Sequence, residues 1–228
     1  MSIKLSPVRV VSPVFETVID GNSMIAYNQS AIEVEVEPLP DDVVLGPNWI
    51  NDKMTLVVYA PSQSVMQVII SPAGETGSSS DALVMKKASG LDDVWWLELD
   101  LSLGQYDYEY LLLDGTRIPD PLSRRLESNR TRIEIGSGGI STADDYQWQS
   151  NSYSRPDLDT LIIYEMHIDD YAAVGNGQGR FSHIIDKLDY IKSIGVNAIE
   201  LLPITDFPGT HSWGYDPHLI SAVESNYG

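Results

Sequence analysis

Histidines and a glycine-rich stretch are the first residues of this sequence whose types could do chemistry. Zinc sites usually combine histidines at i, i+4 helical spacing or include cysteine partners. The chain has no cysteine, and its four histidines lack that spacing: His167, His183, His211 and His218. Residues 175–179 resemble a phosphate-cradling loop, but the Lys-Ser/Thr pair that completes such a loop is missing. We therefore expect no metal and no cofactor, and a flexible connection at 175–179.

A strand, a helix and a second strand are predicted in the last third of the chain. Leu161–Ile168 is an apolar strand, and from Phe181 onward apolar residues recur at helical spacing. Ser182 is a plausible N-cap of this helix, and Gly195 stands where a C′ glycine belongs. The next apolar run, Val196–Leu202, is the second strand. This pattern indicates two parallel strands joined by a right-handed crossover.

The segment that follows the second strand is where chemistry is expected. Ligands of parallel sheets and barrels lie beyond the carboxyl ends of the strands. That segment contains the run His211–Pro217, which reads HSWGYDP. Two carboxylates, Glu165 and Glu200, alternate with apolar residues inside the strands. We expect these two to be structural, hydrogen-bonded and directed into the interior.

Residues 3–125 carry the pattern of an all-β sandwich, with short apolar or alternating runs separated by turn residues. The clearest predicted strands are Met54–Tyr59, Val65–Ile70, Val94–Leu99 and Tyr106–Leu113. The last run ends in Asp114-Gly115, a tight-turn signal that should lead directly into a further strand at Arg117 and Ile118. Trp95 and Trp96 are adjacent on a predicted strand, so their rings should face opposite sides. We expect the outer ring to contact the following domain.

Four segments are predicted along the chain. Residues 1–40 form a small β segment with strand candidates at Val8–Val11, Met24–Tyr27 and Ala31–Val36, and residues 41–136 form the sandwich. Residues 137–160 are a linker, because 137–156 is rich in Ser, Gly, Asp, Gln and Asn. Residues 161–228 hold the strand–helix–strand unit.

The composition excludes some classes of partner. A formal net charge of −19 and a pI near 4.3 disfavour binding to nucleic acid, because phosphate would be repelled. No run of about 18 apolar residues is present, so no membrane span is predicted. A neutral ligand such as a sugar is compatible with this charge.

Four ordered motifs resemble the α-amylase superfamily, glycoside hydrolase family 13. They are Ile163–His167 (IYEMH), Lys187–Ile191 (KLDYI), Gly195–Pro203 (GVNAIELLP) and Ser212–Tyr215 (SWGY). The upstream sandwich is similar to the immunoglobulin-like domain that precedes the barrel in many members of that family. Its supporting phrases are Leu56–Pro61 (LVVYAP), Trp95-Trp96 and Asp114–Pro121 (DGTRIPDP).

The resemblance implies an immunoglobulin-like β-sandwich followed by the first βαβ part of a (β/α)8 TIM barrel. It implies a retaining mechanism on α-glucosidic bonds of starch- or glycogen-like glucans, which needs two carboxyl groups roughly 5 Å apart. The family's catalytic residues follow its third barrel strand, so no catalytic residue is assigned here. The chain alone is expected to be inactive and to need its missing barrel strands.

The resemblance also implies a substrate contact. Tyr215 matches the family tyrosine whose ring packs against the glucose at the scissile bond, and a pyranose offers that ring an apolar face. Trp213 and Asp216 flank it as further candidates for the substrate site, although each also fits a purely structural role, Trp213 as a packed anchor and Asp216 as a hydrogen-bonded loop residue.

Other functions remain open on the sequence. Within the class, a glycogen-branching enzyme and a hydrolase that releases trehalose from malto-oligosyl trehalose have similar N-terminal layouts. From another class, the chain could be a non-catalytic glucan-binding fragment, or a truncated product with no independent role. Ser71–Asp81 stands where related glucan-binding modules carry Gly-Asp-Phe-Asn-x-Trp, which argues against glucan binding by the sandwich. Relatives with this layout are commonly exported by bacteria, which favours an exported over a cytoplasmic location.

Overall fold

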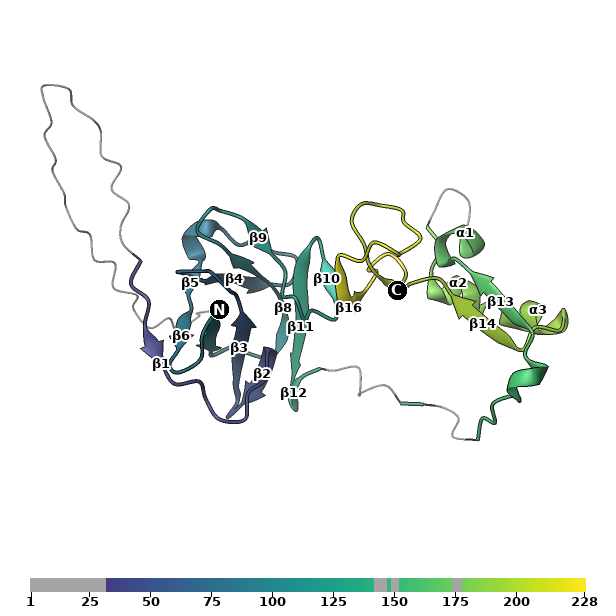
Figure 1. Ribbon diagram of the computed structural model, residues 1–228, viewed down its shortest axis with the longest axis horizontal. Helices are drawn as coiled ribbons and strands as arrows, with labels where there is room; N and C mark the ends of the chain where they lie inside the picture. Colours follow the sequence, from purple (N-terminus) through teal and green to yellow (C-terminus); the bar gives the residue numbers. More distant parts are fainter. Residues whose placement is uncertain (1–31, 142–146, 149–151, 174–177) are drawn as a thin grey trace, which may run out of the picture.

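The computed structural model describes residues 32–141, 147–148, 152–173 and 178–228. A sheet-rich domain precedes a smaller part that contains the helices (Figure 1). Strand β16 (Leu219–Val223) lies beside the end of the sheet-rich domain, where Val223 forms an isolated parallel bridge with Arg125. The expected strands Val8–Val11 and Met24–Tyr27, and most of the glycine-rich stretch 175–179, lie outside the described residues.

Two sheets make up the first domain in the described residues. One has the order β1-β6-β7-β3-β2, and the other follows β10-β11-β8-β4-β5, with β12 on β11 and β9 on β8. The strands of the first sheet are β1 (Val36–Glu37), β2 (Gly46–Ile50), β3 (Lys53–Tyr59), β6 (Lys86–Ala88) and β7 (Val94–Leu99). Those of the second are β4 (Gln67–Pro72), β5 (Leu83–Val84), β8 (Gly104–Leu111), β9 (Arg117–Ile118), β10 (Leu126–Glu127), β11 (Arg130–Gly136) and β12 (Gly139–Ile140).

One apolar core joins the two sheets. Leu56 and Trp95 from the first sheet pack in the same cluster as Val68, Tyr108 and Ile135 from the second. Alternating positions on each strand supply these residues, which is why the period-2 runs of the sequence form the strands.

The predicted strands agree closely with this domain. Strand β7 has the predicted limits, Val94–Leu99, and β3 starts one residue before the predicted Met54. The predicted turn at Asp114-Gly115 leads into β9, which pairs antiparallel with β8, with Leu111 opposite Arg117. Gly115 has a φ of +86°, the left-handed conformation that such a tight turn requires.

The N-terminal segment and Trp96 are connected in the structure. Val36–Glu37 pairs in parallel with β6, so this part of the predicted 1–40 segment lies in the same sheet as the sandwich strands. Trp95 is in the central core and Trp96 is in a separate cluster on the other side, so the two rings face opposite sides as predicted. The prediction that the outer ring contacts the following domain is wrong, because Trp96 is buried in a cluster against which Leu39 and Val43, just after β1, pack.

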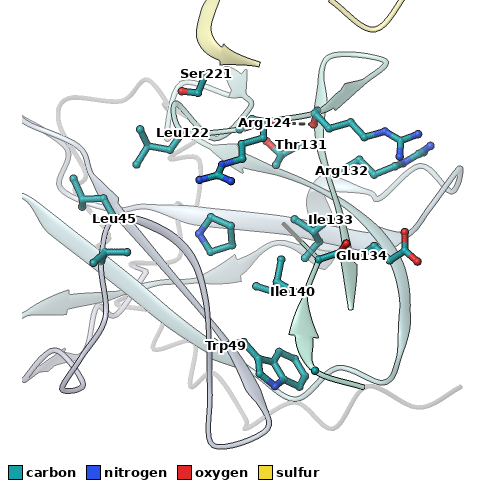
Figure 2. Close-up of a pocket in the computed structure, with 16 residues that line it drawn as sticks. Leu45, Trp49, Leu122, Arg124, Thr131, Arg132, Ile133, Glu134, Ile140 and Ser221 are labelled. Carbon is teal, nitrogen blue, oxygen red and sulfur yellow. Dashed lines mark hydrogen bonds between the residues drawn. The ribbon is translucent and has the colours of Figure 1, made fainter. Parts of the chain in front are cut away.

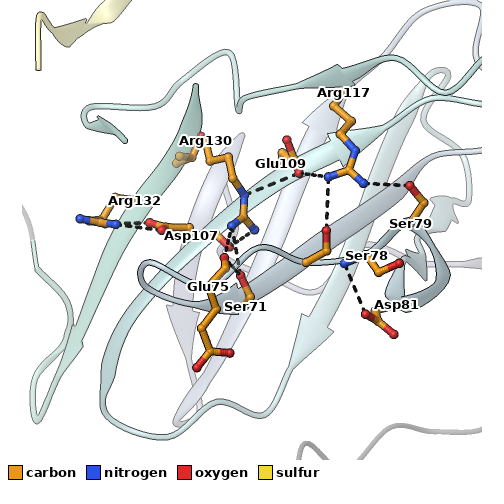
Figure 3. A network of polar contacts seen from close by, with 12 residues as sticks. Ser71, Glu75, Ser78, Ser79, Asp81, Asp107, Glu109, Arg117, Arg130 and Arg132 are labelled. Atoms are coloured by element: carbon orange, nitrogen blue, oxygen red, sulfur yellow. Dashed lines mark hydrogen bonds and ion pairs between the residues drawn. The ribbon is translucent and has the colours of Figure 1, made fainter. Parts of the chain in front are cut away.

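A ladder of charged residues covers the outer face of the second sheet (Figure 3). Arg132 binds Asp107 through two hydrogen bonds of 2.7 and 2.8 Å, and the Arg117–Glu109 ion pair is 2.7 Å long. Arg130 donates to the carbonyl of Glu75 at 2.7 Å, which ties the polar loop 71–81 to the sheet. Burial alone would raise the pKa of Asp107, but hydrogen bonds from Arg132 and from the Gly74 N–H hold it below its ordinary value.

Asp120 is a buried carboxylate beneath the core tyrosines. The hydroxyls of Tyr108 and Tyr110 donate to its Oδ2 at 2.8 and 2.9 Å, and the Leu122 N–H donates to Oδ1 at 2.8 Å. Desolvation raises the pKa of Asp120 above 3.8, because these hydrogen bonds offset the burial only in part.

A pH dependence of stability follows from Asp120. The folded state binds its proton more tightly than the unfolded state, so the stabilisation from protonation is complete below the unfolded pKa and disappears as pH rises through the folded pKa. We expect the free energy of unfolding of the wild type, relative to Asp120→Asn, to decrease as pH rises from 3 toward 7 in urea titrations. A constant or increasing difference would contradict this assignment.

The second part contains the predicted parallel strands. Strand β13 (Ile163–Met166) pairs with β14 (Ala198–Leu201), with Ile163 opposite Ala198 and Met166 opposite Leu201. The predicted linker is not wholly irregular, because it contains β12 and a 3-10 helix, η3 (Leu158–Thr160). A short antiparallel pair, β15 (Thr205–Asp206) and β16, follows β14.

The predicted single helix is divided. Its residues form α2 (Phe181–Ile185) and α3 (Leu188–Ser193), and a short helix that was not predicted, α1 (Ile168–Ala172), begins at the last residue of the predicted first strand. The prediction that Ser182 is the N-cap is wrong, because Arg180 occupies that position and Ser182 lies inside α2. Between α2 and α3, Lys187 donates through Nζ to the Tyr171 carbonyl at 2.9 Å and lies over the Tyr171 ring. Gly195 has a φ of +96° directly after the Ile194 C-cap, as predicted.

Candidate functional site

The aromatic loop, defined as residues 212–216, lies between β15 and β16 and carries all three candidate substrate residues. The Ser212 hydroxyl donates to the carboxylate of Asp216, and its oxygen accepts the Gly214 N–H at 3.0 Å. This hydroxyl therefore closes a small hydrogen-bonded ring that fixes the backbone on both sides of Tyr215. Asp216 has the structural, loop-closing contact that was one of its two predicted roles, here with a side chain instead of backbone.

Gly214 determines how the aromatic loop sits on the preceding strand. Its φ is +82°, and an added Cβ would overlap the carbonyl oxygen of Pro203 and lie 2.9 Å from the Pro203 side chain. Only glycine allows this left-handed turn and this close approach together. The loop therefore packs closely against Pro203, in the segment that follows β14.

The two aromatic rings of the loop face solvent. Trp213 is 62% exposed and Tyr215 is 68% exposed. Trp213 thus does not act as a packed anchor, which was the structural role considered for it. Large exposed rings on a fixed backbone are suited to covering an apolar ligand surface. A Tyr or Trp side chain has only two rotatable angles to be ordered when a ligand binds.

A buried histidine supports the aromatic loop from below. His167, at the carboxyl end of β13, is 7% exposed, and its Nε2 lies 2.9 Å from the Ser212 carbonyl oxygen and 3.0 Å from the Tyr227 hydroxyl. Its Nδ1 lies 3.0 Å from the Asp170 carboxylate. Sequence reasoning used His167 only as part of a motif, although a polar residue at the carboxyl end of a barrel strand was a usable signal.

Two further histidine–carboxylate pairs border the loop. His211 Nδ1 lies 3.1 Å from Asp169, and His218 Nδ1 lies 3.0 Å from Asp206. Burial would raise the pKa of Asp169, but the Gly179 N–H and His211 hold it below its ordinary value. Burial also raises the pKa of Tyr227 to about 12, so its hydroxyl is protonated at neutral pH.

The two strand carboxylates lie on the face of the β13–β14 pair that points away from the helices. Glu165 and Glu200 are opposite each other in the parallel register, while Met166 and Leu201 on the other face pack in the cluster that contains Ile184 and Ile191. Both carboxylates are exposed in the described part of the chain. Their direction is that of a barrel interior, and their structural, hydrogen-bonded role stays a prediction.

The described residues contain no group of three or more His, Cys, Asp or Glu side chains placed to hold a metal ion. None of the helices in that part of the chain combines the length and the apolar character needed to cross a membrane.

A groove of about 690 Å³ lies where the sheet-rich domain meets β16 (Figure 2). Trp49, Ile133 and Ile140 contribute apolar surface, Arg124 and Arg132 lie toward one side, and Ser221 comes from β16. None of the candidate residues Trp213, Tyr215 and Asp216 lines it. The aromatic loop is therefore a separate feature from this groove.

Comparison with known proteins finds relatives among the enzymes that act on α-glucans. Residues 151–228 match the family model described as the α-amylase catalytic domain. The malto-oligosyltrehalose trehalohydrolase of Saccharolobus solfataricus is 38% identical over 122 residues, which is 53% of this chain and 20% of that protein. The 1,4-α-glucan branching enzyme of Picrophilus torridus is 34% identical over 93 residues, 40% of this chain and 13% of that protein.

A solved structure resembles most of the chain. The crystal structure titled as a putative α-amylase from Salmonella typhimurium superposes with a TM-score of 0.62 and 25% identity, covering 81% of this chain and 29% of that one. The fold is therefore of the amylase type. This chain therefore resembles the α-amylase superfamily of glycoside hydrolases, with a family match that covers residues 151–228. It spans about a fifth of the length of the trehalohydrolase that it matches.

Proposed function

We propose that this chain is the N-terminal portion of a retaining glycoside hydrolase that acts on α-glucosidic bonds of starch- or glycogen-like glucans. Its contribution is the substrate contact made by the aromatic loop, with Tyr215 packing on a glucose ring and Trp213 and Asp216 beside it. The observation that carries the proposal is the exposed Tyr215 ring on a backbone fixed by Gly214 and Ser212, beyond the carboxyl ends of two parallel strands.

The catalytic carboxylates are proposed to lie outside these 228 residues. Exposed apolar side chains occur on β13, β14 and the helices around them, as expected if further barrel strands cover them: Ile163, Tyr164, Ile185, Leu188, Ile194 and Ile199. Glu165 and Glu200 are the carboxylates on the two strands, and among the described residues both are exposed, without the enclosed surroundings that position an acid/base pair. The chain alone is therefore expected to release no reducing sugar from soluble starch. Release above background would show that the catalytic groups are present.

Among the enzymes of this class, hydrolysis of malto-oligosyl trehalose is the activity best supported. The trehalohydrolase relative aligns over more of this chain, and at higher identity, than the branching enzyme does. A glucan-binding fragment without catalysis is the second candidate, and the exposed rings alone are sufficient to support it.

The Tyr215→Ala variant tests the substrate contact. Loss of an aromatic surface that stacks on a sugar should weaken maltoheptaose binding about tenfold, which corresponds to about 1.4 kcal/mol, as measured by calorimetric titration of the 228-residue chain. Tyr59→Ala is the matched control, because Tyr59 is also an exposed tyrosine but lies on β3 of the sheet-rich domain. Equal affinities of Tyr215→Ala and wild type, or no binding by wild type, would contradict the proposal.

A further inference from the structure

His167 is buried, yet it contacts three different parts of the fold. It directly follows β13, caps the first turn of α1 through a 3.4 Å hydrogen bond from the Asp170 N–H to Nδ1, and contacts the carbonyl of Ser212, 45 positions further along the chain. Its ring also lies edge-on to His211, with centroids 5.4 Å apart. A buried polar side chain with several partners is costly to misplace, because each lost partner leaves a desolvated group.

The contact with Ser212 has a defined direction. A carbonyl oxygen only accepts, so the proton of this 2.9 Å contact must belong to Nε2 of His167. The neutral form protonated on Nε2 and the doubly protonated form both supply that proton. In the neutral form Nδ1 accepts the Asp170 N–H, whereas in the doubly protonated form Nδ1 donates to the Asp170 carboxylate instead.

Ser212 connects this contact to the exposed rings. Its carbonyl is held by His167, while its hydroxyl is bonded to Asp216 and to the Gly214 N–H. The preceding residue, His211, is also tied to the α1 region through Asp169. The aromatic loop is thus attached at its first residue to the end of β13.

We infer that His167 is a positioning residue, which fixes the Ser212 carbonyl and thereby the directions of Trp213 and Tyr215. The inference extends the proposed function to the residue that orients its substrate contact. The placement of the loop can nevertheless be measured without any glucan, so the two proposals can fail separately.

Fluorine NMR of the chain labelled with 5-fluorotryptophan tests the inference directly. Trp213→Phe identifies the Trp213 signal, and Trp95 and Trp96 report on the sandwich. His167→Gln retains a donor near the Nε2 position and should leave the Trp213 signal nearly unchanged. His167→Asn can still pair with Asp170 but does not reach Ser212, so it should shift or broaden the Trp213 signal while Trp95 and Trp96 stay unchanged.

Two control variants separate positioning from general loss of structure. His183→Gln removes another histidine of the same part of the fold, on α2, and should leave the Trp213 signal in place. Tyr227→Phe removes the hydroxyl that shares Nε2 but keeps the His167–Ser212 contact, so it should also leave that signal in place. The inference would be overturned if the Trp213 signal changed equally in His167→Asn and His167→Gln. It would also be overturned if that signal changed as much in Tyr227→Phe as in His167→Asn. If His167→Ala fails to fold, the Asn and Gln pair still decides the question.

Maltoheptaose affinity gives the second measurement. His167→Asn should bind about tenfold more weakly and His167→Gln within about threefold of wild type, as expected for one lost hydrogen bond to a buried group. Absence of binding by wild type would defeat the proposed function, while the fluorine signals would still decide the role of His167. Wild-type affinity in His167→Asn, despite a displaced Trp213 signal, would overturn the substrate contact of the aromatic loop and leave the positioning role of His167 in place. An unchanged Trp213 signal in His167→Asn would overturn the positioning role.

Discussion

Trp95→Ala is expected to lower the free energy of unfolding of the sheet-rich domain by about 3–5 kcal/mol. Trp95 is 0% exposed and packs between the two sheets with residues such as Met66 and Tyr108. Truncation removes buried apolar contact and leaves a cavity that rigid sheets fill only in part. Urea denaturation, followed by far-ultraviolet circular dichroism, measures the change.

Two variants separate core packing from the mere loss of a tryptophan. Trp213→Ala removes the same side chain from a 62% exposed position and should change stability by less than about 0.5 kcal/mol. Trp95→Phe keeps most of the ring volume. It also loses no hydrogen bond, because the Trp95 indole nitrogen has no hydrogen-bond partner among the described residues. The loss of unfolding free energy in Trp95→Phe should therefore be much smaller than in Trp95→Ala. Similar losses in Trp95→Ala and Trp213→Ala would contradict the assignment of Trp95 to the core.

Gly214→Ala is expected to displace the aromatic loop and to reduce maltoheptaose affinity by more than tenfold. An alanine at a φ of +82° costs about 1–3 kcal/mol in backbone strain, and its Cβ would also overlap the Pro203 carbonyl, which belongs to the backbone and cannot rotate away. Hydrogen exchange of the amides of residues 212–216 should become faster, because the ring closed by Ser212 cannot form on a displaced backbone.

Gly209→Ala is the matched control for that change. Gly209 has a similar φ of +92°, but nothing lies within 4 Å of the position of its added Cβ. Gly209→Ala should carry the strain of the left-handed conformation without a clash against another residue. Hydrogen exchange of residues 212–216 should therefore increase less in Gly209→Ala than in Gly214→Ala. Equal hydrogen exchange in the two variants would show that contact with Pro203 does not fix the loop.

Local pattern was sufficient to predict much of the fold. The alternation in residues 94–99, the tight turn at Asp114-Gly115 and the glycine after the last helical residue, Gly195, each depend on neighbours within a few positions. These features occur in the structure at or near their predicted positions. The motif around Tyr215 was singled out by its resemblance to the α-amylase superfamily, and its contact with substrate stays a prediction.

Features that depend on distant parts of the chain were not predicted. The alternation predicted that Trp95 and Trp96 face opposite sides, but could not show which ring is the outer one or that Leu39 and Val43 pack against the cluster of Trp96. The helical periodicity from Phe181 gave no sign of the break at Lys187, where the side chain is tied to Tyr171. In each case the deciding partner lies far along the sequence, so the local pattern carries no information about it.

The sequence by itself determined most strand positions and the parallel pair with its intervening helical residues, because these follow from side-chain periodicity and turn chemistry. The aromatic loop was singled out by its resemblance to a family motif. Only the tertiary structure decided how that loop is held. His167 and Ser212 are 45 residues apart, and Gly214 meets Pro203 only after the chain has folded back along β14. Hydrogen bonds and close contacts act over a few ångströms in space, so they are fixed by the path of the backbone and not by separation along the chain.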